Sequence, residues 1–108
     1  MDIMRMLKQV QSAQTHAQEL QREMESARHE GSAGGGMVKA VVTGLGELRS
    51  VAIDPEVVNA DDIELLQDLV VSAVRSAQEA ATADRDRRVG ELTMGLAGLN
   101  IPGLGPQP

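Results

Sequence analysis

Few residues in this chain could carry out acid, base or metal chemistry. The 108 residues include two histidines, His16 and His29, and no cysteine. The sequence contains no nucleophile elbow, no paired His-Glu metal motif and no Gly-Lys-Ser/Thr phosphate loop, which are the spacings that such chemistry uses. We therefore expect no enzymatic activity, no cofactor, no metal ion and no small-molecule substrate.

A glycine run and an acidic segment are two further candidates for a binding role. A phosphate-binding nest has a strand before its glycines and a helix after them, but Gly34-Gly35-Gly36 has the reverse order, so a turn is favoured. Residues 54–68 hold six acids and no base. We favour helix capping over a cation site, with Asp61 as the cap and Glu64 in the first turn, because the helix dipole favours acids there.

The remaining candidate residues for a binding role are basic. The acidic segment accounts for the whole formal net charge of -6, since the other residues hold ten acids (16 minus six) and ten bases. Basic patches can therefore form elsewhere. The absence of Phe, Tyr and Trp disfavours single-strand binding by base stacking. The densest basic cluster runs from Asp84 to Arg88, where charge pairing within a solvated helix is the alternative to a binding role.

Two long helices are predicted to position these side chains. Residues 2–27 contain neither Gly nor Pro, and their apolar residues recur at steps of three and four, which predicts an amphipathic helix. At about 1.5 Å per residue it would be roughly 40 Å long, so part of its apolar stripe should meet a second chain or project as an arm. A second helix is predicted over about 61–92, and the Gly- and Pro-rich residues 95–108 form a predicted flexible tail.

Two runs rich in β-branched residues, 37–43 and 48–53, predict an antiparallel hairpin around Gly44-Leu45-Gly46-Glu47. With Leu45-Gly46 as its loop, one face consists of Val38, Ala40, Val42, Val51 and Ile53. The second face is also apolar and consists of Met37, Val41, Leu48 and Ala52. One face can lie on the protein's own helices, and the other is a candidate subunit contact, with Met37, Val41 and Leu48 as dimer-interface candidates. Taken alone, residues 31–36 favour a linker.

No membrane partner is expected from the sequence. No segment approaches about 18 uninterrupted apolar residues, and the N-terminus lacks the basic and apolar regions of an export signal. Together with the absence of cysteine, this favours a cytoplasmic protein.

Several segments together resemble the YbaB/EbfC family of nucleoid-associated bacterial DNA-binding proteins. The run from Gly34 to Gly44, followed by Val51 to Pro55, closely resembles the family's core pattern. The acidic helix start at Asp62 to Ala73 and the ending at Gly95 to Leu99 are similar to the family as well. The order and spacing of these segments extend the resemblance over nearly the whole chain.

The resemblance implies an α+β fold in a single domain over residues 1–94. A long N-terminal helix, a small antiparallel three-stranded sheet and a long C-terminal helical segment would form it, and two subunits would join in a tweezers-like dimer with helical arms. It also implies a first strand over about 28–34, where the residues alone favour a helix end and a linker. This chain departs from the family in being acidic and poor in lysine.

The resemblance further implies duplex DNA as a partner, a location in the nucleoid, and a role in organising the nucleoid or modulating transcription. We expect phosphate contacts with loose or no sequence preference. The candidates for DNA contact are Arg5, Lys8, Arg22, Arg85, Arg87 and Arg88. The alternative is a dimeric protein-interaction module or adaptor with no direct DNA binding.

Overall fold

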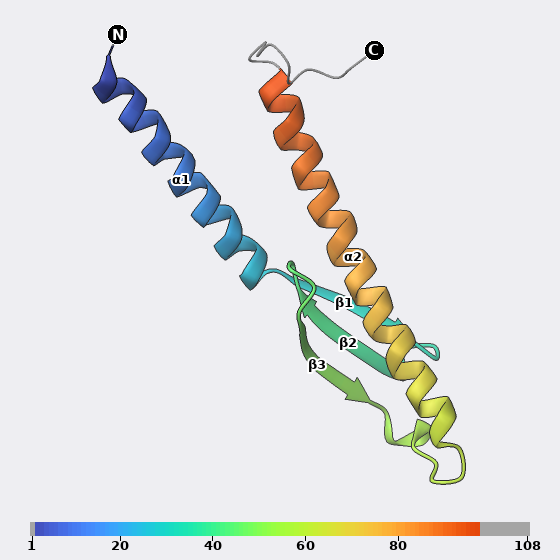
Figure 1. The fold of residues 1–108 in the computed structure, drawn as a ribbon. Helices are drawn as coiled ribbons and strands as arrows, with labels where there is room; N and C mark the ends of the chain where they lie inside the picture. Colours follow the sequence, from blue (N-terminus) through green and yellow to red (C-terminus); the bar gives the residue numbers. More distant parts are fainter. Residues whose placement is uncertain (1, 98–108) are drawn as a thin grey trace.

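The computed structural model describes residues 2–97 (Figure 1). The elements in chain order are α1 (Ile3–Ser26), β1 (Arg28–Ala33), β2 (Val38–Thr43), β3 (Leu48–Ile53), a short 3-10 helix η1 (Pro55–Val57) and α2 (Ile63–Ala97). The strands form one antiparallel sheet in the order β1-β2-β3. The predicted α+β fold is confirmed. In this described part of the chain, neither helix is long and apolar enough to cross a membrane.

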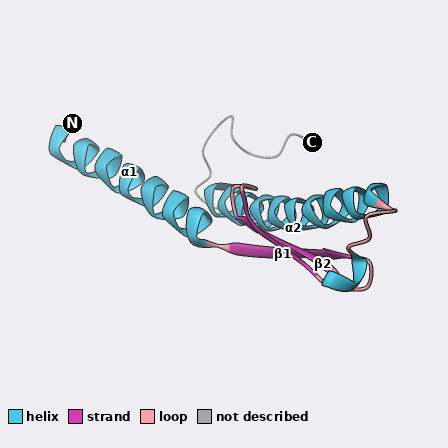
Figure 2. Ribbon diagram, turned by 90° about the horizontal axis from the view of Figure 1, so that it is seen from below, coloured by secondary structure: helices cyan, strands magenta, loops and turns pink. Residues whose placement is uncertain are grey.

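Helix α1 is an arm that the other described residues leave uncovered except at its last turn. The side chain of Asp2 caps its start by accepting hydrogen bonds from the backbone N–H groups of Met4 and Arg5. None of its residues is buried, and the helix extends away from the sheet (Figures 1 and 2). The radius of gyration is 20.6 Å, against about 13 Å for a compact chain of this length. The helix therefore projects, as its length predicts.

Strand β1 includes residues 31–33, the first half of the segment for which the residues alone favour a linker. It pairs with β2 along its whole length, although it has a glycine at its centre and no β-branched residue. Packing explains the glycine, because a Cβ on Gly31 would lie 2.2 Å from the backbone N of Ala77 and 2.4 Å from the carbonyl oxygen of Ala73. The linker interpretation is wrong, since β1 lies directly against the backbone of α2 at a contact that only glycine allows.

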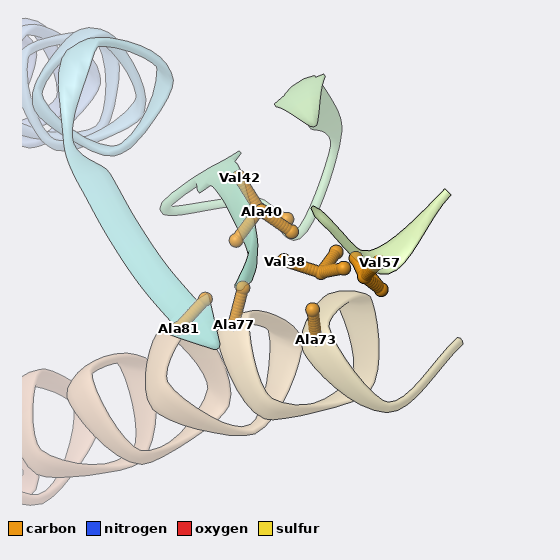
Figure 3. Close-up of a cluster of buried hydrophobic side chains, with 7 residues drawn as sticks. All are labelled: Val38, Ala40, Val42, Val57, Ala73, Ala77 and Ala81. Atoms are coloured by element: carbon orange, nitrogen blue, oxygen red, sulfur yellow. The ribbon is translucent and has the colours of Figure 1, made fainter. Parts of the chain in front are cut away.

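The core lies between the sheet and α2, and all of its buried apolar side chains are valine or alanine (Figure 3). They are Val38, Ala40 and Val42 of β2, Val57 of η1, and Ala73, Ala77 and Ala81 of α2. The predicted common face of the three β2 residues is thus confirmed. Because α2 packs on β1 and β2 rather than on β3, the same face of β3 is left without a helix over it.

The hairpin differs from the prediction near its turn. Residues 38–41 of β2 pair with β3 in the register that a two-residue Leu45-Gly46 loop requires. Val42 then pairs with Leu48, where that register requires Arg49. Arg49 is therefore an extra residue in β3, a β-bulge. Directly opposed residues share a face, so Leu48 lies on the side of Val42. The predicted grouping of Leu48 with Val41 is wrong for this reason.

The N-terminal cap of helix α2 lies one residue later than predicted. The N–H of Leu65 donates to Oδ1 of Asp62 at 3.2 Å, whereas the N–H of Asp61 donates to Oδ1 of Asn59 at 2.9 Å in the preceding turn. Asp62, not Asp61, is therefore the cap. The helix continues to Ala97, past the predicted end at 92 and into the first residues assigned to the tail. The rest of the predicted tail lies outside the described residues.

Candidate nucleic-acid interface

Three of the predicted DNA-contact residues lie on one side of α1. At about 100° per residue, Arg5, Lys8 and Arg22 fall within an arc of about 100°, and the apolar stripe follows the opposite side. All three are exposed, and none takes part in an ion pair within residues 2–97. Glu19 and Glu23 lie beside Arg22, so the positive charge of this basic face is densest at its N-terminal end.

The other three predicted residues do not form one surface. Arg85 and Arg87 are about 160° apart around α2. A guanidinium nitrogen of Arg85 donates to Oγ1 of Thr82 at 3.2 Å. Arg87 and Arg88 both donate to Asp84, the second through Nε at 3.0 Å from Oδ2. Two of the three guanidinium groups are thus paired within α2, which is the charge pairing considered as the alternative to a binding role.

Asp84 is the centre of a charged cluster where α1, β1 and α2 meet. Its side chain is only 16% exposed, and Nε2 of His29 lies 3.5 Å from its Oδ2. That nitrogen is buried and has no hydrogen-bond partner among the residues that the structure describes. The hydrogen bond from Arg87 is the main cause that holds the pKa of Asp84 below its ordinary value; burial opposes this shift and Arg88 adds to it. Asp84 is therefore the anion that orders two neighbouring arginines.

Arg88 extends this cluster to the arm. Its Nη1 lies 3.5 Å from Oε2 of Glu23, the pair that joins α2 to the last turn of α1. The spacing of Asp84 from Arg87 and Arg88, three and four residues, was visible in the sequence. The contact with Glu23 was not, because it depends on how the two helices lie in space. In the described part of the chain, no group of His, Asp and Glu side chains is arranged to hold a metal ion.

The predicted dimer-interface residues occupy three different environments. Met37 packs against the core. Val41 is half-buried and lies between Glu30 and Ser50 on the side of the sheet that faces away from α2. Leu48 is 50% exposed on the opposite side. The structure therefore places exposed apolar surface on both sides of the hairpin but does not bring these three side chains together.

A small antiparallel sheet that carries two long helices, one of them with an exposed basic face, defines an α+β protein. A comparison with known families agrees with this architecture. The family described as the YbaB/EbfC DNA-binding family matches residues 1–96, and the chain belongs to this family.

Individual relatives support the assignment. A nucleoid-associated protein of Streptomyces avermitilis is 47% identical over 103 residues, which cover 95% of this chain and 91% of that protein. A nucleoid-associated protein of Saccharopolyspora erythraea is 45% identical over 109 residues, covering 95% and 94%. The crystal structure of an uncharacterized Helicobacter pylori protein has a TM-score of 0.70 at 25% identity, covering 85% of this chain and 97% of that one. The two nucleoid-associated proteins match nearly the whole chain.

Proposed function

We propose that this protein is a homodimeric nucleoid-associated protein that binds duplex DNA through phosphate contacts, with loose or no sequence preference. Through this binding it organises the nucleoid or modulates transcription. The observation that carries the proposal is the basic face of α1, which holds Arg5, Lys8 and Arg22 on an exposed arm. The names of the relatives, which are nucleoid-associated proteins, support the same location for this chain.

The basic face favours backbone contacts over base reading. Arg5 and Arg22 are about 25 Å apart along the helix axis at 1.5 Å per residue, the length of roughly seven base pairs at 3.4 Å each. Such a face follows a phosphate backbone. Reading a sequence requires side chains that reach base edges in a groove, and three well-separated basic residues supply few of these.

The acidic segment gives the subunit electrical polarity. It lies around η1 and the start of α2, at the end of the molecule opposite the N-terminal tip of α1 (Figure 1). Six carboxylates without a base repel a polyanion, whereas the arm tip carries Arg5 and Lys8. Repulsion by the acidic segment disfavours contact with DNA at that end of the subunit, and attraction by the basic arm tip favours contact there. DNA is therefore directed to the arms in spite of the net charge of -6.

Exposed apolar surface supports the dimer part of the proposal. On α1, Ile3, Leu7 and Val10 are 68%, 52% and 56% exposed, and on β3 the exposed residues include Leu48 and Ile53. Monomeric proteins seldom leave such stripes uncovered, and a second copy would cover them while doubling the number of basic faces. The rival function, a protein-interaction module, would use the same stripes to hold a different protein.

A pair of binding experiments tests the proposal against its rival. Fluorescence anisotropy with two unrelated duplexes should show similar binding to both at low salt and weaker binding as salt rises, because phosphate contacts release counterions. A pull-down from nuclease-treated lysate tests the rival. No binding to either duplex at low salt, together with retention of a defined protein, would overturn the DNA proposal.

A further inference from the structure

The last turn of α1 meets the loop after β2 at a very close contact. The N–H of Gly44 donates to the carbonyl oxygen of Met24 at 2.8 Å. A Cβ on Gly44 would lie 2.7 Å from that oxygen and 3.0 Å from the Cα of Met24. Gly44 is not among the glycines with positive φ, so the close approach of α1, and not the backbone conformation, requires glycine at this position.

A second contact joins the same turn of α1 to α2. Glu23 meets Arg88, whose guanidinium is held on its other side by Asp84. An exposed ion pair alone contributes little, about 0 to 1 kcal/mol. Here one partner is already ordered, since the side chain of Arg88 is 34% exposed and fixed by Asp84. Less side-chain entropy is therefore lost when Glu23 joins it.

We infer that these two contacts form a joint that sets the direction of α1 relative to α2, and that Gly44, Glu23 and Asp84 are positioning residues for DNA binding. For its DNA part, the inference rests on the proposed function. In the proposed homodimer, the direction of α1 in each subunit sets the distance between the basic faces of the two arms, which must meet phosphates simultaneously. It is the place where α1 contacts the sheet and α2 in the described structure, because the arm is exposed from Asp2 to Glu19.

The length of the arm amplifies any change at the joint. The Cβ of Gly44→Ala must retreat by about half an ångström to reach an acceptable contact. Across one helical turn of about 5.4 Å, this displacement is a rotation of about 5°. At a point 15 residues from Met24, about 22 Å along the helix, the same rotation moves the backbone by about 2 Å.

Distances between spin labels test the joint directly. The chain has no cysteine, so Gln9→Cys on α1 and Ser76→Cys on α2 provide two unique labelling sites. Doubly labelled protein is diluted with excess unlabelled protein so that the distances within one subunit dominate. Gly44→Ala should shift the mean distance by up to about 2 Å, and Glu23→Gln should broaden the distribution. Circular dichroism checks that each variant is folded.

Two matched controls isolate the joint from general effects. Gly90→Ala also adds a methyl group to a glycine, but a Cβ there meets nothing within 4 Å. Glu19→Gln removes the same charge from α1, but within residues 2–97 the ion-pair partner of Glu19 is His16 of its own helix. Both should leave the distances unchanged. Unchanged distances in both Gly44→Ala and Glu23→Gln would overturn the inference.

DNA affinity then tests the positioning role with effects of opposite sign. Removing a carboxylate makes the arm less negative, so electrostatics alone predicts tighter binding for both variants, and binding at least as tight for Glu23→Gln, which also frees Arg88 from one partner. The joint predicts weaker binding for Glu23→Gln than for Glu19→Gln, by about threefold or more. Equal affinities for the two variants would overturn the positioning role. If the wild type binds no DNA, the proposed function fails, and the distance measurements still decide whether the joint exists.

Discussion

Two variants with matched charge changes separate the basic face of α1 from the arginines of α2. One replaces Arg5, Lys8 and Arg22 with Gln, and the other replaces Arg85, Arg87 and Arg88 with Gln. Each lowers the formal net charge of -6 by three per subunit, so nonspecific charge effects are equal. We expect the first variant to lose much more DNA affinity, because Arg87 and Arg88 are already paired with Asp84.

The salt dependence gives the magnitude. If the three α1 residues of both subunits each neutralise one phosphate, about six contacts give a slope of log K against log salt near -5. Raising salt from about 50 to about 200 mM then weakens wild-type binding by about 10³-fold. The α1 variant should lose most of this slope, whereas the α2 variant should keep more than half of it.

The assay is anisotropy of a labelled duplex at four or five salt concentrations for the three proteins. Thermal melting is measured in parallel, because Arg88→Gln also weakens the cluster around Asp84. The reasoning is refuted if the α2 variant flattens the slope as much as the α1 variant, or if the α1 variant keeps the wild-type slope.

Three further predictions follow from packing and charge. Sedimentation should show a homodimer at micromolar concentration, and Val41→Asp should cause dissociation or misfolding; an unchanged dimer would exclude Val41 from the interface and the core. Gly31→Ala should lower the free energy of unfolding by more than about 2 kcal/mol in chemical denaturation, because its Cβ would lie 2.2 Å from the backbone N of Ala77; an unchanged midpoint would argue against this close approach. Asp84→Asn should lower the melting temperature at pH 7. Because the folded-state pKa of Asp84 is depressed, its contribution is present above the ordinary carboxyl pKa and is lost as pH falls through the folded-state pKa. The difference from wild type should therefore narrow on acidification; a difference that does not narrow would contradict the role of its charge.

The sequence predicts the elements that show periodic patterns. Both helices and the β2-β3 hairpin follow from apolar spacing and from glycines in the turn, and these patterns act over a few residues. Strand β1 has no such pattern, because its central residue, Gly31, is selected by contact with α2 and not by strand propensity. The resemblance to a family supplies this strand where local physics favours a linker.

The site shows the same division between local and long-range effects. The spacing of Arg5, Lys8 and Arg22 around a helix is readable from the sequence. The bulge at Arg49 is not, because it depends on how the turn closes. The contact between Glu23 and Arg88 joins residues that are 65 positions apart, so it depends on the position of both helices against the sheet.

The close seam between β1 and α2 should tolerate different substitutions from those that the exposed helix α1 tolerates. At Gly31, Ala73, Ala77 and Ala81, the limit is space, so substitution by any larger side chain should be selected against whatever its polarity. Along α1, where no residue is buried, size matters little, and charge and helix propensity should determine which substitutions survive. A saturation-mutagenesis profile would therefore show volume intolerance at the seam and charge intolerance on the arm, and so separate the requirements of folding from those of binding.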